Sequence, residues 1–329
     1  KDNTCYFLAI DFDEDDWFDA MLSVYRVAKR YGIDSLMERS KSGNGGHLWI
    51  FFDNNIYASY VRKLGFFLLD KAMKVNKRIT FKSFDRLFPN QDTMPIGGFG
   101  NLIALPMQYD AINNNKNTLF IGEDGKLVNN QFIHLANIKK TSLLKVEEIC
   151  QKNTERVFNN NISEEIVVKF NNEIKIIEGT MLKIYRLNLN ALTLNTIKKV
   201  ASMWNQEYFL FQNMHRPIYH KTTPAILSEY EVLDEYLYLP RGLKQKLLKI
   251  FDDRLKIEET TELGHEIEVK FKGKLVEYQE KIIDELDKHD LGIVEAPTGS
   301  GKTIMALAVI AKYKVSTLII LPGKELLKQ

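Results

Sequence analysis

Two aspartates, Asp11 and Asp13, lie two residues apart at the end of the apolar segment 6–13. That segment has the composition of a strand, and strand residues two apart point to the same face, so the carboxylates should lie about 6–7 Å apart. At an effective dielectric constant near 20, two such charges repel by roughly 2–3 kcal/mol. A shared divalent cation is the commonest reason to keep such a pair. The alternative is a strand end in water, which weakens the repulsion.

A third acid, Asp85, follows the strand-like segment 79–82. If it converges on Asp11 and Asp13, the three carboxylates would give two Mg²⁺ or Mn²⁺ ions the bridging ligands that phosphoryl or nucleotidyl transfer requires. Pairing with the adjacent Arg86, or capping of a turn, is the structural alternative for Asp85.

A glycine-rich loop, Ser42 to Gly46, precedes His47, which opens the apolar segment 47–52. Small residues let a backbone approach an anion, and Ser42, Lys41 and His47 can all donate hydrogen bonds. A lone histidine is more often a structural residue, but one that directly follows such a loop and opens a strand is a candidate phosphate ligand.

A second glycine loop, residues 296–303, has the sequence APTGSGKT. A glycine-rich turn between a strand and a helix directs backbone N–H groups at phosphate oxygens, at the positive end of the helix. Lys302 would then reach the β- and γ-phosphates, and Thr303 would coordinate Mg²⁺. Ala296 stands where the usual pattern has its first glycine.

The composition is that of a globular protein with two or three domains: 329 residues, 45% hydrophobic and 27% charged, with a formal net charge of +2. The two cysteines, Cys5 and Cys150, exclude a disulfide scaffold and favour a reducing compartment, so we expect a cytoplasmic protein. Apolar runs such as 317–321 have strand length, so no membrane segment is expected. Because the chain opens at Lys1 and ends inside an expected helix, we expect it to be part of a longer protein.

The basic residues are distributed unevenly. Residues 62–86 contain eight Lys or Arg and two Asp, whereas residues 11–19 contain six acids and no base. Acids that bind metal beside a cationic stretch suit a site that handles phosphates and a nucleic-acid strand. For individual lysines such as Lys71 and Lys74, a solvated helix face is the better explanation.

Hydrophobic periodicity divides the chain into segments 1–142, 143–265 and 266–329, each with mixed helix and strand signals. The expected strands are 6–13, 47–52, 102–106, 166–170, 173–177, 266–271, 291–295 and 316–321. The expected helices are 17–31, 57–75, 194–211, 228–237, 244–252, 276–288 and 302–312.

The N-terminal motifs together resemble those of archaeo-eukaryotic primases, and residues 84–92 and 97–106 are similar to the primase–helicase fusions of TOTE conflict systems. The resemblance implies a palm with an RRM-like sheet, in which Asp11, Asp13 and Asp85 hold two divalent ions and act in catalysis. It also implies that an incoming NTP or dNTP is bound. The residues implied for its triphosphate are Ser42, Gly43, His47, Arg86 and Lys82.

The C-terminal segment resembles superfamily-2 helicases, which implies an ATP site in the first part of a RecA-like parallel α/β domain. Residues 319–329 are similar to the motif that contacts the nucleic-acid backbone. The implied ATP-binding residues are Gln279, Thr298, Gly299, Ser300, Gly301, Lys302 and Thr303. The acidic box and the arginine fingers of the family are not among these 329 residues, so we expect nucleotide binding without ATP hydrolysis by this chain alone.

The resulting expectation is an α/β (α+β) protein with a primase palm, a mixed connector and the beginning of a helicase. Its leading function is template-dependent DNA primase–polymerase activity on a single-stranded template and primer, coupled to the remainder of the helicase. The alternatives are an inactive primase-like module that grips nucleic acid, and a nuclease or restriction-type motor. The strand that His47 opens, and the lack of an acid-x-Lys pairing near Asp85, favour synthesis.

Overall fold

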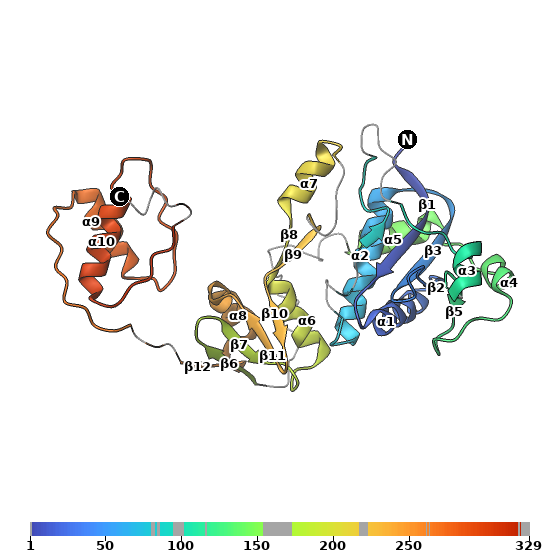
Figure 1. Cartoon of the computed structure of the whole chain (residues 1–329), viewed down its shortest axis with the longest axis horizontal. Coiled ribbons are helices and arrows are strands. Elements are labelled where there is room, and N and C mark those ends of the chain that lie inside the picture. The colour runs from blue at the N-terminus through green and yellow to red at the C-terminus, as the bar shows by residue number, and fades with distance from the viewer. Residues whose placement is uncertain are drawn as a thin grey trace. The chain divides into compact units, whose positions relative to one another are not determined.

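The computed structural model describes residues 2–79, 83, 86–94, 102–115, 117–153, 173–216, 223–260, 262, 264–321 and 323 (Figure 1). The chain folds into two compact units. The first comprises residues 1–176 and 181–257, and the second comprises residues 177–180 and 258–329. Among the described residues, no helix combines the length and the hydrophobicity needed to cross a membrane.

The first unit is built on a five-stranded sheet with the strand order β4-β1-β3-β2-β5. In chain order, the elements β1, α1, β2, β3, α2 and β4 give the split βαβ arrangement that RRM domains share. The RRM-like palm expected from the sequence is therefore present. The bounds are β1 Thr4–Phe12, α1 Trp17–Arg30, β2 Leu36–Arg39, β3 Gly46–Tyr57, α2 Ala58–Val75, β4 Arg86–Phe88 and β5 Phe120–Ile121.

The two faces of this sheet have different partners, because successive side chains of a strand point to opposite sides. Leu8 and Ile10 of β1 belong to a core that also contains buried side chains of α1 and α2. Ala9 belongs to a smaller core on the other face, with Trp49 of β3. Residues from the segment 103–138, which includes α3 Tyr109–Asn115 and α4 Gln131–Ala136, pack against that second core. Asp11 follows Ala9 by two residues and so lies on the face opposite α1 and α2.

A second five-stranded sheet, with the order β10-β11-β7-β6-β12, encloses a core of its own with α6 and α8. The short pair β8–β9 and the helix α7 pack instead on the first sheet's helical side, since Tyr208 and Ile226 belong to the first core. The bounds are α5 Leu143–Asn153, β6 Ile174–Glu178, β7 Leu182–Tyr185, α6 Ala191–Val200, β8 Ser202–Trp204, α7 Gln206–Asn213, β9 Ile226–Ser228, β10 Glu231–Leu233, β11 Tyr236–Leu239, α8 Lys244–Phe251 and β12 Leu255–Glu259.

Three expectations for the first unit are wrong. The helix expected over 228–237 is a hairpin of β10 and β11, because Leu237 and Leu239 alternate with partly exposed tyrosines and Asp234 takes the left-handed backbone of a turn. The helix expected over 194–211 is interrupted by β8. Residues 102–106 form no strand. The expected strand 166–170 lies outside the described residues.

The second unit contains α9 Glu277–Leu286 and α10 Lys302–Tyr313, close to the expected bounds. The strands expected over 266–271, 291–295 and 316–321 are not formed by the described residues, which have one antiparallel bridge, between Glu266 and Val315. Ile293 is 97% exposed, so it lacks the covering that makes an apolar strand stable. An apolar run forms a strand only where a neighbouring strand can pair with it, because backbone N–H and C=O groups need hydrogen-bond partners.

Candidate active site on the sheet face

Four polar residues form one row across four adjacent strands of the first sheet. In the strand register, Asp11 of β1 lies opposite Arg86 of β4 on one side and His47 of β3 on the other. His47 in turn lies opposite Glu38 of β2. Because directly opposed residues of antiparallel strands project from the same face, the four side chains share the face opposite α1 and α2.

The centre of the row is buried. Glu38 is fully buried, His47 is 6% exposed and Asp11 is 8% exposed. The Nδ1 atom of His47 lies 3.0 Å from Oε2 of Glu38, and Nε2 of His47 lies 3.4 Å from Oδ1 of Asp11. The indole N–H of Trp49 donates to the same Oε2 of Glu38. The imidazole is therefore held between two carboxylates, and Glu38 fixes its orientation.

These contacts change the proton affinity of His47. Burial by itself lowers the pKa of an imidazole, because it disfavours the charged form. The carboxylates of Asp11 and Glu38 outweigh burial and raise the pKa of His47 to about 9. At neutral pH the imidazole is thus protonated, and both its nitrogens are donors.

Asp11 has the environment of a cation ligand. Its Oδ2 lies 3.9 Å from Nε of Arg86, a long ion pair. Its Oδ1 is buried and has no partner of hydrogen-bond geometry within the described part of the chain. Its nearest donor is Nε2 of His47, at 3.4 Å, which leaves room for this oxygen to bind a cation as well. Mg²⁺ and Mn²⁺ prefer oxygen ligands, so the carboxylate of Asp11 fits a divalent cation. Asp13 is exposed, just beyond the end of β1, where it could supply a second oxygen.

The glycine loop reaches the acids through Gly45. A Cβ atom added to Gly45 would lie 2.5 Å from Oδ1 of Asp13 and 2.6 Å from the carbonyl oxygen of Phe12. At Gly46 an added Cβ would meet the ring of Trp17 at 2.7 Å. Glycine is therefore needed at Gly45 for the β2–β3 loop to lie against the end of β1, and at Gly46 for the start of β3 to lie against Trp17 at the start of α1. The acidic pair and the glycine loop, separate motifs in the sequence, are in contact in space.

The tip of the same loop holds the predicted phosphate ligands Ser42 and Gly43. Gly43 has a φ of +82°, a left-handed conformation that favours glycine. The hydroxyl of Ser42 lies 3.0 Å from that of Ser40 and accepts a hydrogen bond from the N–H of Asn44. The side chain of Asn117 donates to the carbonyl of Lys41 and closes the loop from outside. The loop thus has a fixed shape before any ligand binds.

Two predicted site residues, Asp85 and Lys82, lie outside the described residues. Within the described ranges, no group of three or more His, Cys, Asp or Glu side chains is arranged to hold a metal ion. The three-carboxylate arrangement therefore stays a prediction, and the described acids of the site are Asp11 and Asp13.

Sequence reasoning missed Glu38 and gave Trp49 no polar role. The signal for Glu38 was present, since it is a carboxylate in a short apolar segment that leads into the loop before His47. Its partner became evident only from the hairpin register, which places Glu38 opposite His47. A buried carboxylate in a strand needs donors. His47 and Trp49 both donate to Oε2, whereas Oε1 has no hydrogen-bond partner among the described residues.

The second candidate site is the loop before α10, in the second unit. Gly299 and Gly301 have φ values of +84° and +79°, so the loop uses backbone conformations that favour glycine. Lys302 donates to the carbonyls of Ala296 and Pro297, at 2.9 and 3.0 Å. The expected ATP-binding residue Gln279, on α9, donates to the carbonyl of Ser300 at 3.0 Å, although the two residues are 21 apart in the chain. The structure therefore brings Gln279 to the loop. Thr298 and Thr303 lie in the same segment.

Comparison with known families agrees with this architecture. Residues 1–149 match the family described as "TOTE conflict system, Archaeo-Eukaryotic Primase domain". Residues 272–329 match the family described as "Type III restriction enzyme, res subunit". The chain carries an archaeo-eukaryotic primase domain at its N-terminus, followed by a superfamily-2 helicase-like region. The resemblance predicted from the motifs is confirmed.

Two curated relatives are similar in sequence over short stretches. The DNA 3'-5' translocase XPB2 of Sulfurisphaera tokodaii is 39% identical over 61 residues, which is 18% of this chain. Rad25 of Haloarcula marismortui, whose name marks it as a proposed DNA 3'-5' helicase, is 34% identical over 91 residues, which is 28% of this chain. The matched stretch spans 14% of the length of each relative.

Proposed function

We propose that the N-terminal domain performs template-directed nucleotidyl transfer, as a DNA primase–polymerase, and that the C-terminal region binds ATP for a helicase. The observation that supports this most strongly is the row of Arg86, Asp11, His47 and Glu38 across the RRM-like sheet. In this row the carboxylate of Asp11, which we propose as a cation ligand, lies between the guanidinium of Arg86 and the imidazolium of His47. Positive charge on both sides suits a site where polyanionic phosphates arrive and leave.

Asp11 and Asp13, with Asp85 as the third predicted ligand, would hold two Mg²⁺ or Mn²⁺ ions. When bound, such ions activate the 3′-hydroxyl and neutralise the leaving pyrophosphate. The Nε2–H of His47, which lies 3.4 Å from Oδ1 of Asp11, would be shared with triphosphate oxygens, and Glu38 keeps the imidazole protonated and oriented through Nδ1. Ser42 and Gly43 lie on the loop that contacts Asp13. The hydroxyl of Ser42 would bind the same triphosphate, and Gly43, whose N–H donates to the carbonyl of Ser40, would let the turn of the loop approach it. Arg86 and Lys82 are further candidate phosphate contacts.

In the second unit, the loop 296–303 would bind the phosphates of ATP through its backbone N–H groups, Lys302 and Thr303. Gln279 would read the adenine, as the resemblance to superfamily-2 helicases implies. Both similar relatives are named for action on DNA, so we extend DNA as the partner to this region. Movement along DNA is a property that we assign to the whole helicase and not to this chain alone.

The test is incorporation of labelled nucleotide on a primed single-stranded DNA template with Mn²⁺ or Mg²⁺. We expect wild type to add the nucleotide that the template specifies. Asp11→Ala should lower the rate by about 10³-fold, because a cation ligand is lost. Asp53→Ala is the matched control, since Asp53 is an exposed acid on β3, and it should retain the rate. Equal incorporation by wild type and Asp11→Ala would refute the proposal.

The two alternatives give different results in companion assays. An inactive primase-like module would bind nucleotide in an Mn²⁺-dependent manner, measured by calorimetry, without incorporating it. A nuclease would nick supercoiled plasmid in Mg²⁺, which a polymerase would not do.

A further inference from the structure

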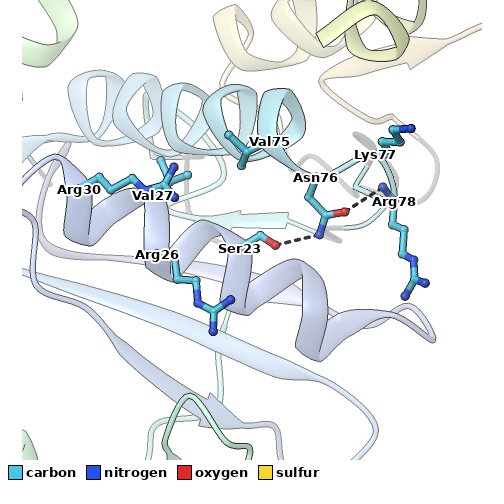
Figure 2. Close-up of a pocket in the computed structure, with 8 residues that line it drawn as sticks. All are labelled: Ser23, Arg26, Val27, Arg30, Val75, Asn76, Lys77 and Arg78. Carbon is cyan, nitrogen blue, oxygen red and sulfur yellow. Dashed lines mark hydrogen bonds between the residues drawn. The ribbon is translucent and has the colours of Figure 1, made fainter. Parts of the chain in front are cut away.

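A second charged feature of the first unit lies in its helical layer. A pocket of about 490 Å³ opens between the second half of α1 and the C-terminal end of α2 (Figure 2). Its lining within the described chain includes two valines and no acid. The polar lining residues are Ser23, Arg26, Arg30, Asn76, Lys77 and Arg78.

The positive charge of this pocket is only partly neutralised. Arg26 pairs with Glu123 at 3.1 Å, and Arg78 pairs with Asp19 at 3.5 Å. The two arginines are 56% and 75% exposed, and exposed pairs of this kind contribute about 0–1 kcal/mol. Arg30 has no ion pair with any residue that the structure describes. The guanidinium groups therefore keep donors for another anion.

The partial negative charges at the C-terminal ends of α1 and α2 offset part of this positive charge. Two helix C-termini carry about −0.5 each, or about −1 together, and basic residues in a last turn commonly offset them. Nearby charges are Lys29, which shares Glu123 with Arg26, Lys198, which donates to the carbonyl of Lys77, and Asp16, which acts on Arg78. With the four cations of the lining this gives six positive charges against three acids, Glu123, Asp19 and Asp16. A surplus of about +2 remains after the helix ends are counted.

The backbone around the pocket is held in place. The side chain of Asn76 donates to the hydroxyl of Ser23 at 2.9 Å and accepts from the N–H of Arg78 at 3.0 Å (Figure 2). From the other side, the buried ammonium of Lys198, on α6, donates to the carbonyls of Lys77 and Ile79. The segment that carries Lys77 and Arg78 is thus ordered in advance, which lowers the entropic cost of binding.

The pocket is separate from the sheet-face site. Val27, which lines it, belongs to the core between the helices and the sheet, together with Ile10 of β1. Asp11, the next residue of β1, projects from the opposite face. A ligand in the pocket is therefore held by residues across the sheet from the acids.

We propose that this pocket binds the sugar–phosphate backbone of a nucleic-acid strand. The planar guanidinium group of arginine can donate two parallel hydrogen bonds to a phosphate. The lining offers hydrogen-bond donors and contains no carboxylate that would repel a phosphate. No aromatic side chain lines the described pocket, so bases have nothing to stack on. Contacts to phosphate without contacts to bases position a strand and do not read its sequence. This inference is independent of the transfer reaction, since it concerns binding alone.

The test compares the double variant Arg30→Gln/Lys77→Gln with Lys139→Gln/Lys140→Gln, which removes two exposed lysines of the same unit. Binding of a fluorescent oligothymidylate to the full chain is followed by anisotropy between about 50 and 200 mM salt, without nucleotide or divalent cation. The pocket variant should bind roughly tenfold more weakly, and its slope of log K against log salt should be shallower by about 1.4. The control variant should match wild type.

Lysine acetylation supplies a second readout on wild-type protein. The oligothymidylate should protect Lys77 but not Lys139 or Lys140, whereas inorganic tripolyphosphate at the same phosphate concentration should protect Lys77 less. The proposal fails if both double variants lose the same affinity, if neither does, or if tripolyphosphate protects Lys77 and the oligonucleotide does not. Thermal melting of the variants checks that all remain folded.

Discussion

The two proposed triphosphate sites, on the sheet face and in the loop before α10, are built in opposite ways. On the sheet face, side chains from four strands do the work, and Glu38, His47 and Asp11 are buried and paired with one another. In the loop 296–303 the backbone forms the proposed site, because Gly299 and Gly301 have positive φ, and the side chain of Lys302 is exposed.

The difference explains why the loop was easier to find from the sequence. A backbone site depends on consecutive residues, so its spacing is visible in one stretch of chain. A side-chain site depends on strand register, which joins residues that are far apart in the sequence. Substitutions in the loop should therefore change the affinity for its ligand alone. Substitutions in the row of the sheet-face site should also change the pKa of His47 and the stability of the fold.

The largest effect in this comparison is expected from Lys302→Ala, which should change ligand binding at the loop and leave the sheet-face site unchanged. Lys302→Ala should weaken ATP binding by roughly 100-fold, because it removes a charge-assisted contact to phosphate. It should leave nucleotide incorporation by the primase domain unchanged. Calorimetric titration with ATP and the incorporation assay measure the two effects. Lys281→Ala, at an exposed lysine of α9, is the control. Loss of incorporation in Lys302→Ala would contradict the independence of the two sites.

The second effect concerns proton affinity in the row. Glu38→Gln keeps the shape of the side chain but removes a negative charge beside Nδ1 of His47, so the pKa of His47 should fall from about 9 toward its ordinary value of 6.5. Nucleotide incorporation near neutral pH should fall with it, by about tenfold. NMR titration of the imidazole, without divalent cations, measures the pKa. Glu231→Gln, at an exposed position on β10, should leave the pKa unchanged.

The same pKa predicts how stability depends on pH. Because the pKa of His47 is raised in the folded state, its stabilising contribution is complete below about pH 6.5 and is lost as the pH rises through about 9. At about 1.4 kcal/mol for each pKa unit, the loss is at most about 3.5 kcal/mol. In Glu38→Gln the loss should be smaller and should occur at lower pH. Denaturant unfolding of wild type and Glu38→Gln at pH 6 and pH 10 measures it. Burial lowers the pKa of Lys198 to about 8, which adds stability over the same range in both proteins. A wild type that loses no more stability than Glu38→Gln would therefore contradict the assignment.

The smallest expected effect is steric. Gly45→Ala places a Cβ atom 2.6 Å from the carbonyl oxygen of Phe12, where backbone has to shift, and should cost about 1–3 kcal/mol of unfolding free energy. Gly242→Ala, where an added Cβ meets nothing within 4 Å, should change stability by less than about 0.5 kcal/mol. Similar melting temperatures for the two variants would show that the loop does not need to lie against β1.

Long amphipathic or apolar elements of the primase domain could be predicted from sequence because their periodicity extends over several turns or residues. The strand 6–13 and the helices 17–31 and 57–75 are present within two residues of the expected bounds. The hairpin of β10 and β11 was mistaken for a helix, since each strand is too short to display its own period. Short apolar runs do not distinguish the two structures.

The candidate site could be predicted in its parts but not in its connections. Asp11, His47 and the glycine loop were identified by residue type and position, and the structure brings them together. Glu38 was missed because nothing in one sequence indicates that β2 pairs with β3 in the register that opposes it to His47. The loop 296–303 was identified from its spacing, and Gln279, named from the resemblance to helicases, contacts this loop at Ser300. Nucleotide binding by both stays a prediction.

The central claim is that a divalent cation binds at Asp11, beside His47, on the sheet face. The chain has six histidines, so imidazole NMR signals of the labelled protein can be resolved and assigned. Because Nε2 of His47 lies 3.4 Å from Oδ1 of Asp11, substoichiometric Mn²⁺ should broaden the His47 signals first, and Asp11→Asn should abolish this selectivity. Sharp His47 signals while other histidines broaden, or broadening that persists in Asp11→Asn, would contradict the account.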